Sequence, residues 1–349
     1  VNSNRVDFFS SISTMDRFQN FGVGTDGVTS MSETLELAKD AEALGYHSFW
    51  LSEGYHSRSA IVRATLIAAA TSKIKIGLGI LSPHTKHPAL LAMEAASLDE
   101  VARDRVILGV GRVLNALRKQ AIDSQGTIEV VKQSIDIIRG FFSGEQFQYD
   151  GSRFKIAAPG SRLDLEPRGK VPVYVGATGP EMFRLAAQYA DGILFNYPCT
   201  PGFIRYAMPI VEAGLARAGR SLDDFDVAAY LLVSVDENEA DAVNAAKRFV
   251  VQKLPTRHSD MLRHAGVTPA EISAVRDSVQ RLGLEKAAAT VDDDVVRKVA
   301  IAGTPDQVAQ SLRAFLGTGL KLPIAWEIVG PDRRRSLDLL ARAVMPKLA

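Results

Sequence analysis

The chain has 349 residues, with 41 Lys and Arg against 40 Asp and Glu, so its net charge is +1. Because the charges nearly balance and the basic residues are spread along the chain, we expect no nucleic-acid partner. No run of about 18 apolar residues lacks charge, and the first residues contain no apolar signal core. We therefore expect a cytoplasmic protein that does not cross a membrane.

Short runs of strand type alternate with longer segments of helical period along the chain, which is typical of β–α units around a parallel sheet. The expected strands are Arg5–Ser10, His47–Leu51, Ile74–Gly79, Arg105–Gly109, Pro172–Gly176, Gly192–Phe195, Asp226–Val233 and Pro323–Ile328. The expected helices include Met31–Leu44, Ala60–Ala70, Ala89–Val101, Ile128–Arg139 and Glu181–Ala190.

Eight strands, each followed by a helix, favour an α/β protein built as one (β/α)8 TIM barrel over residues 1–349, with an open doubly wound sheet as the alternative. Two segments interrupt the alternation, residues 143–170 and 258–299. Because barrel enzymes carry their function on the loops that follow the strands, we expect both segments to be insertions over the C-terminal mouth.

Cysteine and histidine usage argues against a metal site. The single cysteine, Cys199, excludes an internal disulfide and a thiolate cage. The six histidines show no spacing typical of metal ligands. We therefore expect no resident metal.

The loop after the expected strand Pro172–Gly176 is the sharpest candidate for a binding site. Gly176 ends the strand, and Pro180 stands at a favourable first position of the next helix. The free amides of such a helix start, with the Thr178 hydroxyl, form an anion site that suits a cofactor phosphate. Alternatively, Gly179 and Pro180 only mark a turn into the helix.

Two further loops carry candidate residues. Gly109 and Gly111 do not fit the GxGxxG dinucleotide pattern, because residue 114 is Leu. They permit the close approach of a flat group or a phosphate, or simply tight packing. Glu53 and His56 follow the second strand and are candidate proton donors, or a solvated loop carboxylate and a surface histidine.

Several motifs together resemble the luciferase-like oxidoreductases, and within them the branch that contains methylenetetrahydromethanopterin reductase and other enzymes of the deazaflavin coenzyme F-420. The resemblance covers nearly the whole chain. It rests on Ile76–Pro83, His87–Ala89, Ser97–Glu100, Arg105–Gly111, Pro172–Pro180, Ala190–Gly192 and Gly303–Pro305.

The resemblance implies a bulge in the third strand with a non-proline cis peptide, here Gly79–Ile80, that lies behind the cofactor ring. It also implies that Ser82 contacts the ring or its side chain. The phosphate end would be held by Gly109, Gly111, Gly176, Ala177, Thr178, Gly179 and Pro180.

The implied function is hydride transfer between coenzyme F-420 and a small organic substrate, with a proton from Glu53 or His56. The sugar-phosphate dehydrogenase branch has an Asp-His pair after strand two and a Glu after the strand-four glycines. This chain has Glu53-Gly54 and Arg112 there, so that substrate is not expected. The resemblance also implies a homodimer.

Three other functions are compatible with the same residues. One is a monooxygenase that uses reduced FMN supplied by a partner flavin reductase. Another is a non-catalytic flavin-binding protein. The third is an isomerase or lyase barrel that binds its substrate at the phosphate turn, since fold alone does not decide function.

Overall fold

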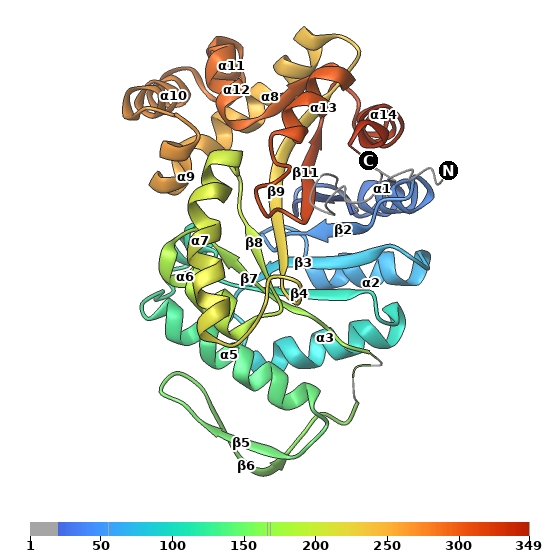
Figure 1. Ribbon diagram of the computed structural model, residues 1–349, viewed down its shortest axis with the longest axis vertical. Coiled ribbons are helices and arrows are strands. Elements are labelled where there is room, and N and C mark those ends of the chain that lie inside the picture. The colour runs from blue at the N-terminus through green and yellow to red at the C-terminus, as the bar shows by residue number, and fades with distance from the viewer. Residues whose placement is uncertain (1–19, 55, 166, 168, 349) are drawn as a thin grey trace, which may run out of the picture.

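A computed structural model describes residues 20–54, 56–165, 167 and 169–348. Nine strands of these residues form one parallel sheet, and eight of them close into a barrel because the outer strands of the series also pair (Figure 1). The expected (β/α)8 barrel is thereby confirmed. In spatial order around the ring, the eight strands are β1 (Gly22–Thr25), β2 (Ser48–Leu51), β3 (Lys75–Leu81), β4 (Val106–Val110), β7 (Val173–Ala177), β8 (Gly192–Phe195), β9 (Asp226–Val235) and β11 (Leu322–Val329).

Helices cover the outside of the barrel, and the ninth strand, β10 (Ile301–Gly303), pairs with the end of β9. The helices of the first half are α1 (Met31–Ala43), α2 (Ala60–Ala70), α3 (Pro88–Ala102), α4 (Leu114–Lys119), α5 (Thr127–Phe142), α6 (Pro180–Tyr189) and α7 (Pro201–Arg217). Those of the second half are α8 (Glu239–Lys253), the 3-10 turn η1 (Leu254–Thr256), α9 (Ser259–His264), α10 (Pro269–Leu282), α11 (Leu284–Thr290), α12 (Asp293–Val299), α13 (Pro305–Arg313), α14 (Arg333–Leu339), the π turn η2 (Leu340–Val344) and the 3-10 turn η3 (Met345–Lys347).

The first barrel strand is β1, which the sequence pattern did not predict. The predicted strand Arg5–Ser10 lies outside the described residues. β1 has only four residues, and two of them, Gly22 and Gly24, are glycines with little strand propensity. A Cβ atom on Gly24 would lie 2.5 Å from the carbonyl oxygen of Trp50, so glycine is needed where β1 passes this residue of β2.

The barrel strands separate two apolar cores, which is why most of these strands are buried on both faces. The outer core lies between strands and helices and contains residues such as Leu37, Ile135 and Phe183. The inner core fills the barrel with large rings, among them Trp50 and Tyr230. The interior is therefore packed, and a ligand has access only at the ends of the strands.

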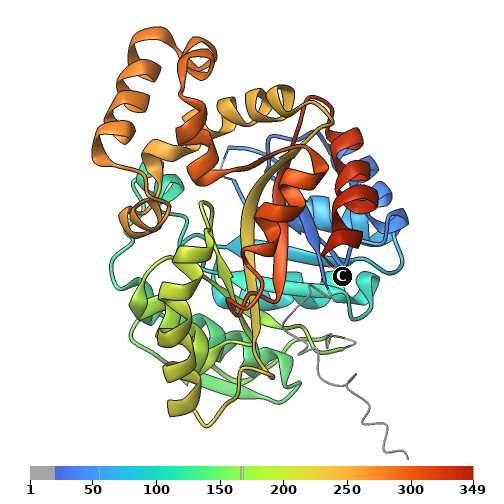
Figure 2. The same cartoon turned by 45° about the horizontal axis from the view of Figure 1, so that its top comes forward.

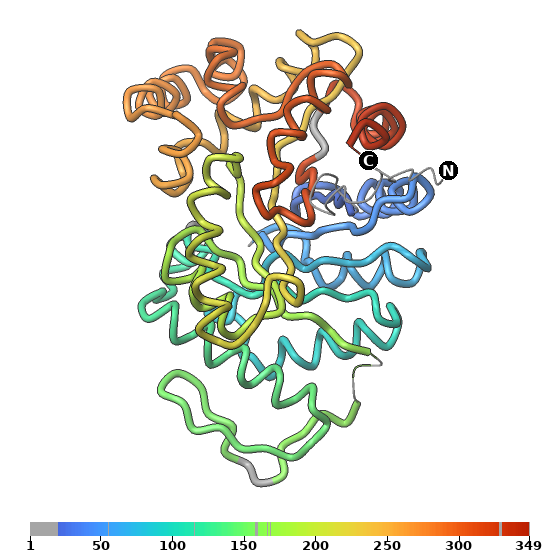
Figure 3. The backbone as a smooth tube through the Cα atoms, viewed as in Figure 1, coloured from blue at the N-terminus to red at the C-terminus, as the bar shows by residue number. Residues whose placement is uncertain are grey.

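The segment 143–170 forms an antiparallel hairpin of β5 (Phe147–Asp150) and β6 (Lys155–Ser161). Only its tip, where Phe154 meets His87 at the start of α3, reaches the mouth end, because the rest packs along α5, which lies between the hairpin and the barrel (Figures 1 and 3). The ring of Phe147 packs edge-on against Phe141, with centroids 4.7 Å apart. The hairpin thus buries its apolar side on a helix, and only its tip approaches the start of α3.

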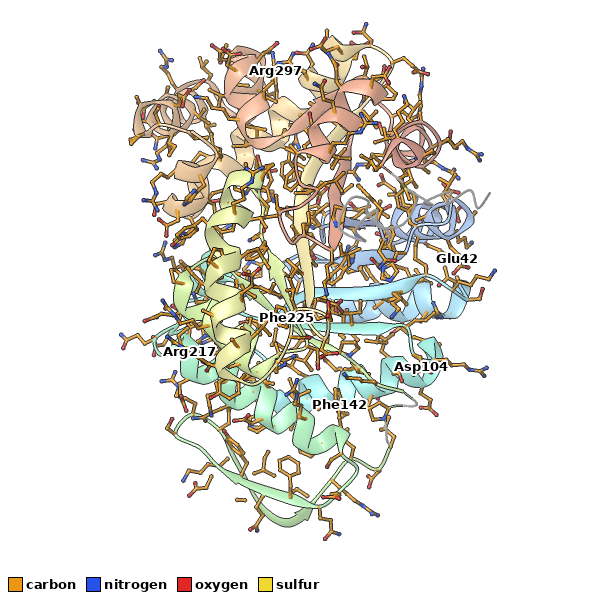
Figure 4. The ribbon with its side chains drawn as sticks, in the orientation of Figure 1. Glu42, Asp104, Phe142, Arg217, Phe225 and Arg297 are labelled. Carbon is orange, nitrogen blue, oxygen red and sulfur yellow. The ribbon has the colours of Figure 1, made fainter. Side chains whose placement is uncertain are left out.

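The segment 258–299 forms α9 to α12, which rise with α8 beyond the C-terminal ends of the strands (Figure 2). His264 of α9 stacks on Tyr206 of α7, with ring centroids 4.5 Å apart. Arg297 of α12, at the far end of this group (Figure 4), pairs with Glu239 of α8 at 2.7 Å. This second segment lies at the mouth end of the barrel.

The opposite end of the barrel is fixed by charged residues, the partly buried Glu42 and the buried Arg105. Glu42, at the end of α1 (Figure 4), accepts hydrogen bonds from the backbone N–H groups of Ser72, Lys73 and Ile74 at 2.6–3.0 Å. Burial raises the pKa of Glu42, but these hydrogen bonds and Arg105 outweigh it, so its pKa lies below the ordinary value. The carboxylate thereby holds the turn that enters β3.

His47, at the same end, makes the stability of the fold depend on pH. Its Nδ1 atom is buried and has no partner among the described residues, and burial with nearby Lys75 lowers its pKa from 6.5 to about 4. Between these values the unfolded chain binds a proton that the folded protein does not, so stability is lost as the pH falls from 6.5 towards 4. Urea unfolding at several pH values should show that His47→Gln loses less stability over this range than the wild type. The two proteins have the same carboxylates, so they should differ only through His47. An equal change in unfolding free energy with pH in both proteins would contradict this account.

Candidate functional site

The cis peptide bond between Gly79 and Ile80 is present, and it lies at the end of β3, at the mouth of the barrel. The pairing of β3 with β4 shifts register between Leu78 and Leu81, which is the expected bulge. The buried hydroxyl of Tyr230, from β9 across the barrel, donates a hydrogen bond of 2.8 Å to the Gly79 carbonyl. The bulge is therefore fixed from the far side of the ring.

The Ile80 side chain lies in a notch formed by three glycines. A Cβ atom would approach this side chain to 3.0 Å from Gly109, 2.5 Å from Gly111 and 2.9 Å from Gly176. Gly109 and Gly111 thus provide tight packing for Ile80, which is one of the two interpretations left open for them. Ile80 remains partly exposed, so it presents an apolar surface to the mouth.

The end of β7 leads into an uncapped helix. Ala177 is buried, whereas Thr178, Gly179 and Pro180 are partly exposed. Gly179 is the N-cap residue of α6 with extended backbone angles, and no side chain caps the helix. A Cβ atom on Gly179 would meet no atom within 4 Å. Free amides and open space at the positive end of a ten-residue helix suit an anion such as a phosphate.

Ser82 is buried at 1% exposure, at the start of the turn that follows β3. Its carbonyl accepts hydrogen bonds from the Thr85 hydroxyl at 3.0 Å and from the backbone N–H of Lys86 at 3.1 Å. Its hydroxyl oxygen accepts a longer bond of 3.4 Å from the His84 N–H. These bonds shape the turn beside the bulge.

The two predicted proton donors lie on one loop but in different environments. Glu53 is partly buried, and its Oε2 accepts a hydrogen bond of 2.9 Å from the Ala60 N–H at the start of α2. His56 is exposed and has left-handed backbone angles, with φ of 63°. The structure thus holds Glu53 in a fixed position and leaves His56 on the surface.

The floor of the mouth is aromatic, a feature that the sequence analysis missed. Trp326 of β11 stacks on Tyr230, with ring centroids 5.1 Å apart and planes inclined by 22°. Trp50 meets Tyr230 edge-on at 6.1 Å. All three lie within expected strands, where large apolar residues indicate core, so only the closed barrel shows that they face one centre.

A pair of carboxyl groups at the ends of β1 and β11 was also missed. Oε1 of Glu327 accepts a hydrogen bond of 2.8 Å from the Asp26 N–H, and Arg333 lies 3.4 Å from Oε2. Burial and the Asp26 charge raise the pKa of Glu327 to about 7, although Arg333 opposes them. The backbone angle φ of 57° at Glu327 and the irregular register of β11 bring this side chain beneath the β1 loop.

The described residues were also searched for metal ligands and membrane spans. They contain no group of three or more His, Cys, Asp or Glu side chains placed to hold a metal ion. None of their helices is both long enough and apolar enough to cross a membrane.

Comparison with known proteins places residues 11–322 in the family described as luciferase-like monooxygenase. The chain is 31% identical to a 5,10-methylenetetrahydromethanopterin reductase of Archaeoglobus fulgidus, over 89% of this chain and 94% of that protein. It is 27% identical to a coenzyme F-420-dependent glucose-6-phosphate dehydrogenase of Nocardia farcinica, over 86% of both chains.

Solved structures agree with these similarities. The coenzyme F-420-dependent tetrahydromethanopterin reductase of Methanopyrus kandleri superposes with a TM-score of 0.88 and 28% identity, over 95% of this chain and 99% of that one. An FMN complex of a Baeyer–Villiger monooxygenase of Pseudomonas putida has a TM-score of 0.69 and 18% identity, over 95% and 99% of the two chains, which shows a shared fold alone.

The glycine notch predicts unequal effects for two similar substitutions. In Gly109→Ala the new methyl group would lie 2.5 Å from the Leu78 carbonyl oxygen, a backbone atom that cannot move cheaply. We expect a loss of about 1–3 kcal/mol in unfolding free energy. In Gly111→Ala the closest atom is the terminal Cδ1 atom of Ile80, which can rotate away, and the nearest backbone atom, the Gly176 carbonyl oxygen, is 3.2 Å away, so its loss should be smaller. Chemical denaturation measures both, and an equal or reversed order would contradict the described notch.

Proposed function

Because the chain belongs to the luciferase-like monooxygenase family, we propose that it is an oxidoreductase that transfers a hydride between coenzyme F-420 and a small organic substrate. The observation that carries this proposal is the combination of the Ile80 surface with the uncapped start of α6. The similarity to coenzyme F-420-dependent enzymes over nearly the whole chain supports the choice of cofactor.

The residues at the mouth fit the two ends of such a cofactor. The partly exposed Ile80 offers an apolar surface against which a flat ring can pack. The amides at the start of α6 and the Thr178 hydroxyl offer donors to a phosphate, and the absence of a side chain at Gly179 leaves room for it. Gly109 and Gly111 contribute indirectly, since they hold Ile80 in place.

The protein contributes position and environment, while the bound cofactor supplies a carbon that exchanges a hydride with the substrate. The Tyr230 hydrogen bond holds Gly79 and therefore the surface behind the ring. Helices α8 to α12 rise beside the mouth (Figure 2), and their proposed role is to limit the access of water to the reaction. Glu53, held at the start of α2, is the proposed proton donor.

A second copy of the chain is the proposed partner. Val62 of α2 and Leu90, Met93 and Val101 of α3 are between 42% and 57% exposed. The two helices are neighbours on the outside of the barrel, so these side chains give it an apolar face. We propose that the same face of a second copy covers it, because a two-fold dimer buries identical patches together.

The phosphate site can be tested by giving α6 a cap of its own. The extended backbone at Gly179 accepts Asp, whose carboxylate would bond the free amides and repel a phosphate. We expect Gly179→Asp to raise thermal stability while it weakens coenzyme F-420 binding at least about tenfold, followed by ring fluorescence. Gly179→Asn is the uncharged control and should lose less affinity.

Three outcomes of this titration would count against the proposal. If Gly179→Asp binds coenzyme F-420 as tightly as the wild type does, the phosphate does not bind at the start of α6. Preference of the wild type for FMN would favour the monooxygenase, and binding of neither cofactor would contradict a cofactor site altogether.

The acid role of Glu53 is tested by Glu53→Gln. The amide oxygen can still accept the Ala60 hydrogen bond, so stability should change little while the proton is lost. Turnover should fall about 100-fold or more with cofactor affinity retained, in steady-state assays with the substrate found by screening. A fall in cofactor affinity with unchanged turnover would remove Glu53 from the acid role, and His56→Gln is the matched test of the other candidate.

A further inference from the structure

Two cations one helical turn apart face the mouth from the end of α8. Lys253 is the last residue of α8, and Arg257 follows the η1 turn. Phe249 of the same helix packs edge-on against Trp326 at 5.6 Å and against Tyr197 at 5.4 Å, which places this end of α8 over the barrel floor.

The ammonium group of Lys253 lies over aromatic rings. Its Nζ atom is 5.4 Å from the ring centre of Phe249 and 5.9 Å from that of Trp326. It forms an ion pair with Asp26, whose Oδ2 atom is 3.8 Å away and thus beyond hydrogen-bonding distance. At this distance the ammonium group keeps N–H donors that a ligand can use.

Arg257 is a cation without an acidic partner in the described residues. Its guanidinium donates only to backbone carbonyls, that of Lys253 at 3.2 Å and that of Tyr197 at 3.4 Å. The charged group lies 5.9 Å from the ring centre of Tyr197, and burial lowers its pKa. Arginine has five N–H donors, so most of them remain for a ligand.

Two buried donors in the same aromatic cluster lack acceptors. The hydroxyl of Tyr197, a residue with 0% exposure, and the indole N–H of Trp326, with 6% exposure, make no hydrogen bond within the described residues. A buried donor that is left unpaired destabilises the folded protein, so such groups are expected to meet an acceptor in the working protein.

A purely structural account covers only part of this arrangement. The C-terminal end of a helix stabilises a cation in its last turn, which accounts for a lysine at the end of α8. It does not account for the second cation at Arg257 or for the two unpaired donors.

The cluster lies outside the strands β3, β4 and β7 that carry the proposed cofactor site. Trp326 lies in β11, across the ring from β4, and Tyr197 follows β8, which is the neighbour of β7. A cofactor bound along β3, β4 and β7 would leave this half of the mouth to the substrate.

We propose that Lys253 and Arg257, with the unpaired donors of Tyr197 and Trp326, form a subsite for an oxyanion of the substrate, a carboxylate or a phosphate. The identification of the anion as part of the substrate rests on the proposed function. The binding of an anion at these residues does not depend on it. Two cations and two neutral donors match the acceptor-rich oxygens of such a group. The aromatic rings around them suit a flat apolar body attached to it.

The test uses the protein without cofactor and three probes. Benzoate carries a carboxylate on a flat ring, benzyl alcohol is its uncharged counterpart, and inorganic phosphate represents the other oxyanion. Only two tryptophans are present, Trp50 and Trp326, so binding near the cluster should change their fluorescence. Sodium chloride at matched ionic strength is the reference for nonspecific effects of salt.

We expect benzoate or phosphate to bind saturably and benzyl alcohol to bind about tenfold more weakly or not at all. Lys253→Met and Arg257→Met should each weaken anion binding about tenfold or more, with binding of coenzyme F-420 unchanged. Arg248→Met is the matched control, because Arg248 lies on α8, is exposed and pairs with Glu285, so it should bind the anion as the wild type does.

Each result decides between the proposals. Binding of benzoate alone assigns the subsite to a carboxylate. Binding of phosphate alone assigns it to a phosphate where Lys253→Met and Arg257→Met weaken it, since phosphate can also bind at the start of α6. Binding of neither, or binding that both methionine variants retain, would overturn the subsite even if coenzyme F-420 binds. The wild type could also bind the anion but not coenzyme F-420, with anion binding lost in both methionine variants. This result would support the subsite and contradict the proposed function.

Discussion

The position of one side chain, Ile80, depends on residues from four barrel strands, β3, β4, β7 and β9, and shapes the mouth. Its peptide bond to Gly79 turns the end of β3, and Tyr230 of β9 holds that turn through the Gly79 carbonyl. Gly109, Gly111 and Gly176 make the notch in which the side chain lies. Any larger residue in the notch would displace Ile80, so the glycines shape the site through this side chain.

The glycine notch around Ile80 belongs to one of two chemically different halves of the mouth. Over β3 to β7 the backbone is rich in glycine, and the start of α6 is left uncapped. Over β8 to β1 the wall is aromatic and charged, with Trp326 stacked on Tyr230 and Lys253 above it. A phosphate-bearing flat cofactor suits the first half, and a substrate with an oxyanion suits the second.

The sequence predicted what is encoded locally. Gly and Pro at the end of an apolar run located the turn before α6, and the alternation of strands and helices predicted the barrel. β1 was not predicted because two of its four residues are glycines. The reason for a glycine there, the close approach of Gly24 to Trp50, is seen only in the folded structure. The position of the hairpin depends on Phe147 meeting Phe141, a contact that no local pattern reveals.

The residues of the second half were missed for a related reason. Lys253 at the end of a helix and Trp326 within a strand have ordinary local explanations, a favourable helix terminus and a core residue. Their importance follows only from the distance between them in the folded chain and from the hydrogen bonds that they do not make.

A crystal structure of the complex with coenzyme F-420 tests the central claim most directly. The account predicts the ring against Ile80, the phosphate at the amides of α6, and an open space between the ring and Trp326. A phosphate bound elsewhere, or a ring that lies on the Trp326 side with Ile80 uncovered, would contradict it.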